Sequence, residues 1–214
     1  MRSTIAIRAL SLLIYSTLLL PPGLEGRATD PGRVNAWALD PGRSRVGFTV
    51  TKLGFSDVEG EFTDFSGDVS YDAVRPEHSS IRWRVGVASV KTDAANRDRA
   101  LQLPEYFDAV RHPYLTFASR RVKALDATRL EVEGDITIRG RTRPLTIVAV
   151  GDAKSGEFET RFEIDRYDFD VAGGSVMGRL IGRTVRVHLV ARAKEGQRND
   201  RTNPAITRSD SPGR

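Results

Sequence analysis

Few side chains of this 214-residue chain have the types and spacings that catalysis requires. The three histidines, His78, His112 and His188, lie in different segments and lack metal-ligand spacing. Residues 174–177 read Gly-Ser-Val-Met, without the second glycine of a nucleophile elbow, and the chain has no cysteine for a disulfide or a thiolate metal site. We therefore expect no enzyme activity, no cofactor and no metal, and keep a cofactor-free hydrolase or isomerase built from carboxylates as an alternative.

Two arginine–aspartate pairs invite a catalytic interpretation. Arg97 and Asp98 are neighbours in a segment with helical signals. Arg166 and Asp168 lie two residues apart, which on a strand would place both on one face. We interpret the first pair as a salt bridge and cap on a short helix, and give the second pair the same structural role.

The elements that must position these residues are indicated by apolar alternation from about residue 46 to residue 193. Ile81, Trp83 and Val85 share one face of an extended segment, whereas Arg82 and Arg84 share the other. Such strands have one buried face, and the sheet that they form must close or stack to hide it. The pattern predicts an all-β fold, a single antiparallel β-barrel of about eight strands whose apolar interior makes it a container.

Two interruptions of the alternation predict local features. Residues 58–62 and 65–71 differ in phase, which predicts a β-bulge near residues 63–64. One short helical insertion is expected near residues 93–109, with Pro104 ending its helix.

The two ends of the chain differ from the barrel segment. Arg2 and Arg8 precede an apolar core at residues 10–20 that is too short for a membrane span, which predicts a secretory signal; an uncleaved anchor is the alternative. The last twenty residues have almost no large apolar side chain and are expected to be disordered. We therefore expect a periplasmic or secreted protein with a signal peptide at 1–28, a barrel domain at 29–194 and a disordered tail at 195–214.

Charge is spread along the predicted strands rather than gathered in one place. The chain has 33 Lys and Arg against 28 Asp and Glu, a formal net charge of +5. A nucleic-acid-binding protein is expected to show a basic patch with interleaved aromatic residues. We therefore expect no nucleic-acid partner and no stable membrane span, and leave a homodimer open.

Several short motifs occur in an order and spacing that chance rarely produces. They are residues 53–62 (LGFSDVEGEF), 89–92 (SVKT), 96–98 (NRD), 106–109 (YFDA), 113–119 (PYLTFAS), 134–144 (GDITIRGRTRP) and 166–169 (RYDF). Over roughly residues 37–193 the chain resembles the YceI-like family of polyisoprenoid-binding proteins, which are secreted bacterial β-barrels with a lipocalin-like shape.

Two positions depart from that family pattern. Lys52 and Ala100 stand where the family often has histidines. If those histidines grip the polar end of a ligand, Lys52 replaces a titratable ring with a permanent positive charge. The two departures therefore concern the contact with the ligand headgroup rather than the contact with its apolar tail.

The resemblance implies binding and carriage of a long-chain isoprenoid lipid, such as a polyprenyl phosphate or a quinone-type tail, inside the barrel of a secreted envelope protein. A stress-response or structural barrel with a filled core is the alternative. A barrel of about eight strands can either pack its own side chains or hold one slim ligand. The residues expected to contact the ligand are Phe48, Val50, Lys52, Phe62, Ile81, Trp83, Val85, Phe117, Ile136, Phe162 and Ile164.

Overall fold

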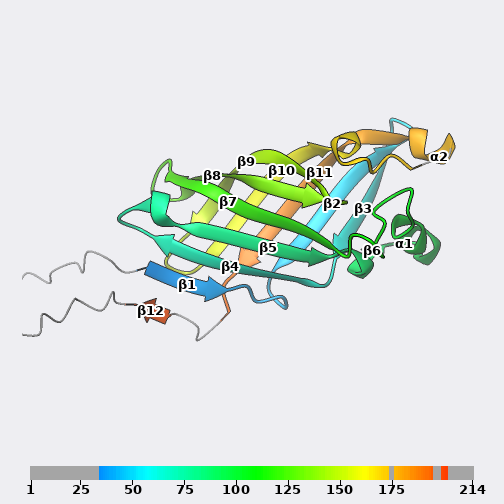
Figure 1. Cartoon of the computed structure of the whole chain (residues 1–214). Coiled ribbons are helices and arrows are strands. Elements are labelled where there is room, and N and C mark those ends of the chain that lie inside the picture. The colour runs from blue at the N-terminus through cyan, green and yellow to red at the C-terminus, as the bar shows by residue number, and fades with distance from the viewer. Residues whose placement is uncertain (1–33, 174–175, 195–198, 202–214) are drawn as a thin grey trace, which may run out of the picture. The chain divides into compact units, whose positions relative to one another are not determined.

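The computed structural model describes residues 34–173, 176–194 and 199–201. These residues form one antiparallel sheet that curls into a half-barrel (Figure 1), which confirms the predicted all-β barrel. The order across the sheet is β12-β1-β4-β5-β7-β8-β9-β10-β11-β2-β3-β6. The strands are β1 (Val34–Ala38), β2 (Arg45–Lys52), β3 (Ser56–Phe62), β4 (Phe65–Asp72), β5 (Ser80–Gly86), β6 (Val90–Thr92), β7 (Tyr114–Ala124), β8 (Arg129–Ile138), β9 (Arg141–Asp152), β10 (Glu157–Asp165), β11 (Ile181–Arg192) and β12 (Asn199–Arg201).

The sheet has twelve strands, whereas the sequence predicted about eight. Strands β6 and β12 contain three residues each, which is too short for alternation to reveal them. The prediction also treated β3 and β4 as one bent strand.

The predicted β-bulge at residues 63–64 is wrong. These two residues join β3 to β4, which lie near opposite edges of the sheet order. The sheet must therefore curl until its two edges meet here. Asp64 accepts a backbone hydrogen bond from Gly86 at 2.8 Å, and Thr63 donates one to Ser89 at 3.3 Å, so the corner is fixed to the end of β5.

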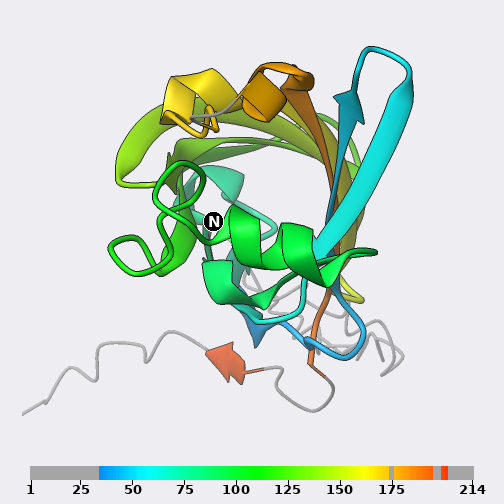
Figure 2. The same cartoon turned by 90° about the vertical axis from the view of Figure 1, so that its right-hand side faces the viewer.

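A second set of contacts closes the sheet between β1 and β11. Leu39 and Ala193 form an isolated antiparallel bridge. The amides of Asp40 and Lys194 donate to the carbonyls of Arg192 and Ala38, at 2.8 and 2.9 Å. Seen end-on in Figure 2, the strands surround one interior.

The wall is incomplete between β9 and β10. These strands pair only at their far ends, where Phe158 lies opposite Gly151. Beyond that point the Thr160 hydroxyl donates to the Val148 carbonyl at 2.9 Å. Pro144 lies in the part of β9 that does not pair with β10. Its lack of a backbone N–H therefore removes no hydrogen bond between these two strands.

The helical segments gather mainly at one end of the sheet, which we refer to as the mouth end (Figure 2). Helix α1 lies within the predicted insertion and confirms it, whereas the other segments are too short for the sequence pattern to reveal. The opposite end carries the β4–β5 and β7–β8 connections (Figure 1). The helical segments are α1 (Ala95–Leu101), α2 (Val176–Arg179) and the 3-10 helices η1 (Pro76–His78), η2 (Val87–Ser89) and η3 (Arg166–Phe169).

The two predicted end segments are largely outside the described residues. The expected signal peptide, residues 1–28, lies wholly outside them. Of the expected tail, the structure describes Asn199–Arg201, which pair with β1 as β12, and the expected disorder of the tail stays a prediction. Over the parts of the chain that the structure describes, no helix is long and apolar enough to cross a membrane.

Candidate ligand-binding site

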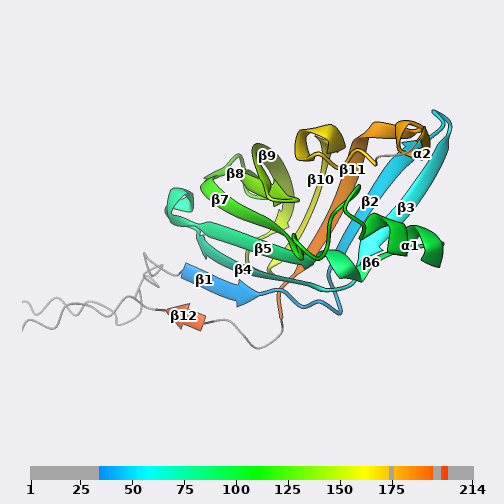
Figure 3. The same cartoon turned by 45° about the vertical axis from the view of Figure 1, so that its right-hand side comes forward.

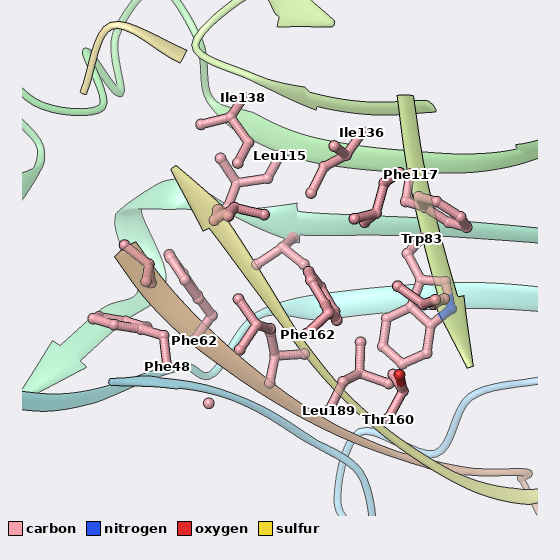
Figure 4. Close-up of a pocket in the computed structure, with 18 of the residues that line it drawn as sticks. Phe48, Phe62, Trp83, Leu115, Phe117, Ile136, Ile138, Thr160, Phe162 and Leu189 are labelled. Atoms are coloured by element: carbon pink, nitrogen blue, oxygen red, sulfur yellow. The ribbon is translucent and has the colours of Figure 1, made fainter. Parts of the chain in front are cut away.

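The curled sheet encloses a cavity of about 450 Å³. Its wall is formed mainly by inward-facing positions of strands β2 to β5 and β7 to β11, and Trp37 of β1 and Thr92 of β6 also contribute. Figure 4 shows Phe48, Trp83 and Phe162, from three different strands, pointing into this space. The alternation that predicted strands thus determines which side chains face the cavity.

All eleven residues predicted from the sequence to contact a ligand line this cavity. Ten are apolar and lie on the inward phase of their strands, and Lys52 lies at the mouth end of β2. Their contact with a ligand remains a prediction. The eleven residues are Phe48, Val50, Lys52, Phe62, Ile81, Trp83, Val85, Phe117, Ile136, Phe162 and Ile164.

Aromatic rings form much of the wall beneath α1. The Phe48 and Phe62 ring centroids are 5.6 Å apart, and Phe62 meets Phe107 edge-on at 6.1 Å. Phe65 stacks on Trp83 at 6.4 Å. These pairs fix the shape of the wall, because aromatic contacts have preferred geometries.

The end opposite the mouth is packed by side chains rather than left open. Val122 and Val132 are buried there against Trp37, Tyr71 and Leu130. Four of these, Trp37, Tyr71, Leu130 and Val132, also line the cavity and were not among the predicted contacts. Trp37 and Tyr71 lie near strand ends, so their place depends on how distant strands close the sheet.

Helix α1 brings polar groups to the mouth end of the cavity. Asp98 accepts hydrogen bonds from the Thr92 amide and hydroxyl, and Arg97 donates to the Thr92 hydroxyl at 3.0 Å and pairs with Asp93. Arg97 and Ala100 both line the cavity. The expected salt bridge between Arg97 and Asp98 is therefore wrong, because each side chain binds the segment that precedes the helix.

Arg166 is a buried cation, 6% exposed, that lines the cavity from η3. The structure places Arg166 and Asp168 on this 3-10 helix rather than on a strand, which corrects the sequence interpretation. The Arg166 guanidinium satisfies its donors with main-chain oxygens, at 2.6 to 2.9 Å, and so fixes the η3–β11 connection. The accepting carbonyls belong to Val171, Ala172, Gly178, Ile181 and Gly182.

Lys52 differs from the two arginines in its contacts. It lines the cavity, and no carboxylate in the described part of the chain forms an ion pair with it. Its ammonium group is therefore available to a ligand, whereas Arg97 and Arg166 are committed to the protein.

The structure does not assemble the groups that were considered for chemistry. His78 lies in η1, His112 precedes β7, and His188 contacts Glu159 at 3.0 Å on β11. Within residues 34–173, 176–194 and 199–201, no group of three or more His, Asp and Glu side chains could hold a metal ion. The arrangement offers an apolar enclosure with a cation at one end.

Comparison with known proteins places this geometry in a family. The YceI-like domain model matches residues 37–193. A UPF0312 protein from Azotobacter vinelandii is 33% identical over 122 residues, which are 55% of this chain and 64%, just under two thirds, of that relative's length.

Two solved structures share the fold. That of Burkholderia cenocepacia BcnA has a TM-score of 0.67 at 22% identity, covering 73% of this chain and 99% of that chain. A polyisoprenoid binding domain from Saccharophagus degradans, implicated in plant cell wall breakdown, has a TM-score of 0.58 at 16% identity, covering 74% and 98%.

Proposed function

The chain belongs to the YceI-like family, and we propose that it binds and carries a long-chain isoprenoid lipid, such as a polyprenyl phosphate or a quinone-type tail, inside the curled sheet. The observation that carries this proposal is the cavity itself, with its apolar wall and its polar groups at the mouth end. The Saccharophagus degradans structure of the same fold is described as a polyisoprenoid binding domain.

The physical chemistry of the cavity favours an apolar chain as its occupant. Burial of each CH₂ group stabilises a bound chain by about 0.8 kcal/mol, so a tail needs few polar contacts. Polar groups suited to a headgroup lie at the mouth end, where Lys52 has no ion-pair partner within the described part of the chain. The ligand would therefore enter tail first, with its headgroup at Lys52.

We further propose that the protein is a carrier rather than an enzyme, and that it acts in the periplasm or outside the cell. Residues 1–28 have the charged start and short apolar core of a secretory signal. Intact-mass analysis of the native protein should give an N-terminus within a few residues of Thr29. Retention of residues 1–28 would contradict export with cleavage.

Two measurements test the lipid proposal together. Mass spectrometry of organic extracts from the natively purified protein should detect an isoprenoid lipid, chemically unchanged after incubation. Delipidated protein should then change its tryptophan emission when titrated with a polyprenyl phosphate, because Trp83 lines the cavity.

The control for the titration is the double variant Trp37→Phe/Trp83→Phe, which removes both tryptophans, because Trp37 lines the cavity as well. This variant should still yield lipid on extraction but show no change of tryptophan emission. No lipid in extracts of either protein and no response to titration would favour the filled structural barrel instead.

A further inference from the structure

The turn between β2 and β3 projects at the mouth end (Figure 3). It carries exposed apolar side chains. Phe55 is 82% exposed and Leu53 is 47% exposed. Leu180, 38% exposed, lies beside them, because its carbonyl accepts a hydrogen bond from the Leu53 amide at 2.8 Å. Lys52 and Arg179 flank these residues in the chain, and we refer to the five together as the tip cluster.

The backbone of this turn does not explain its apolar residues. Leu53 has φ of 56° and Gly54 has φ of 78°, as in a type I′ turn. That turn prefers asparagine or glycine at its first central position, and leucine adopts positive φ only at a conformational cost. A leucine held both in water and in an unfavourable backbone conformation is better explained by a partner surface than by folding.

The charges of the tip cluster indicate what kind of surface that is. In the described residues, neither Lys52 nor Arg179 forms an ion pair with a carboxylate. The nearest acidic residue on β3, Asp57, is already paired with Arg186 at 2.6 Å and accepts a hydrogen bond from Thr51. The tip cluster therefore combines three exposed apolar side chains with two cations that have no carboxylate partner among the described residues.

We propose that the tip cluster docks the mouth end onto an anionic phospholipid bilayer. Apolar side chains beside basic ones fit the membrane interface, where the former enter the headgroup–acyl boundary and the latter meet lipid phosphates. Lys52 belongs to the tip cluster and to the cavity wall, so a docked mouth would face the membrane surface. The proposal that ligand is collected there rests on the proposed function, whereas docking itself needs no ligand.

The test uses vesicle co-sedimentation of the purified protein with phosphatidylglycerol–phosphatidylethanolamine vesicles and with phosphatidylcholine vesicles. Wild type should bind the anionic vesicles more tightly, and high salt should weaken this binding. The double variant Leu53→Asn/Phe55→Ser should bind at least about tenfold more weakly, because it removes two buried apolar side chains from the docked state. Its melting temperature should not fall, because asparagine suits the turn.

The matched control is Val74→Ser, which removes an apolar side chain that is 62% exposed at the opposite end of the sheet. This variant should bind vesicles like wild type. Equal binding of wild type and the double variant would overturn the proposal. So would a change of oligomeric state in the double variant during sedimentation velocity, because the tip cluster would then contact a second copy of the chain.

The docking proposal and the ligand-binding proposal can be contradicted by different experimental results. Leu53 and Phe55 do not line the cavity, so the double variant should still respond to a polyprenyl phosphate added in solution. Wild type that binds vesicles but takes up no lipid would contradict the proposed function and leave docking intact. Wild type that takes up lipid but ignores anionic vesicles would contradict docking alone.

Discussion

At the residue scale, glycines opposite aromatic rings shape the cavity wall. Gly60 pairs with Phe48 across β2 and β3, and a Cβ atom there would lie 2.3 Å from the ring. A Cβ atom on Gly134 would lie 2.5 Å from the Phe117 ring and 2.5 Å from the Ala118 carbonyl oxygen. The rings can lie flat over the neighbouring strand only because these positions have no side chain.

Gly134→Ala should destabilise the protein by about 1–3 kcal/mol, because a backbone carbonyl cannot move aside as a side chain can. Urea denaturation would measure this. The control is Gly42→Ala, where the nearest atom to the new Cβ is 3.4 Å away, so its stability should stay close to that of wild type. Equal stability of both variants would contradict the assigned role of Gly134.

Lys52 is the residue on which the headgroup prediction depends. Lys52→Ala should weaken binding of a polyprenyl phosphate about tenfold or more, because a hydrogen bond to a charged group contributes about 1.5–3 kcal/mol. Wild-type affinity should also fall at high salt. Fluorescence titration of Lys52→Ala and of Lys91→Ala, an exposed lysine outside the cavity, compares the two. If wild type and Lys52→Ala bind the polyprenyl phosphate with equal affinity across the salt series, Lys52 is a solvated strand residue without a role in headgroup binding.

The sequence predicted the inward-facing residues of the long strands because alternation is a local property. Ile81, Trp83 and Val85 line the cavity as their phase indicated. Trp37 and Arg166 could not be found in this way. Trp37 reaches the cavity only because the sheet closes. Arg166 is held at the cavity by main-chain carbonyls of an irregular connection, which alternation cannot predict.

At the element scale, closure of the sheet depends on connections that the sequence describes poorly. The phase change at residues 63–64 was visible, but a bulge and a corner produce the same change in alternation. Only long-range pairing distinguishes them, because β3 joins β2 whereas β4 joins β5. The number of strands therefore differed from the prediction while the class of fold did not.

The β7–β8 turn contains a pH-dependent element. Hydrogen bonds from the Thr128 amide and the Arg129 side chain lower the pKa of Asp126 to about 2 from its usual 3.8. Because the pKa is lower in the folded state, the stabilisation is fully present above about pH 4 and is lost as pH falls through about 2. Asp126→Asn should therefore flatten the dependence of unfolding free energy on pH in this window.

Carboxyl NMR titration of wild type checks the pKa directly, and urea denaturation at pH 5, 3 and 2 compares the two proteins. The asparagine oxygen can still accept the Thr128 and Arg129 amides, so the variant should keep its fold at neutral pH. An Asp126 midpoint near 3.8 would show that the turn does not hold the carboxylate as described.

At the scale of the whole molecule, the decisive question is whether the interior holds a ligand or is a packed core. Buried side chains fill the end opposite the mouth, whereas inward-facing residues such as Val50 and Phe162 surround open space. Val50 is half-buried on β2, opposite Val58 and Val185. A large side chain at this position should therefore enter the cavity.

Val50→Trp should displace the ligand more than it harms the fold. In a packed core the added bulk would strain the structure by about 1–3 kcal/mol, whereas in a cavity it occupies space that a lipid would otherwise fill. We expect a β-rich circular dichroism spectrum, a cooperative melt and little or no lipid in organic extracts. Glu59→Trp adds the same ring on the outward face of β3 and should retain the lipid. If Val50→Trp instead unfolds, and wild type yields no lipid either, the interior is a packed core and this protein is not a carrier.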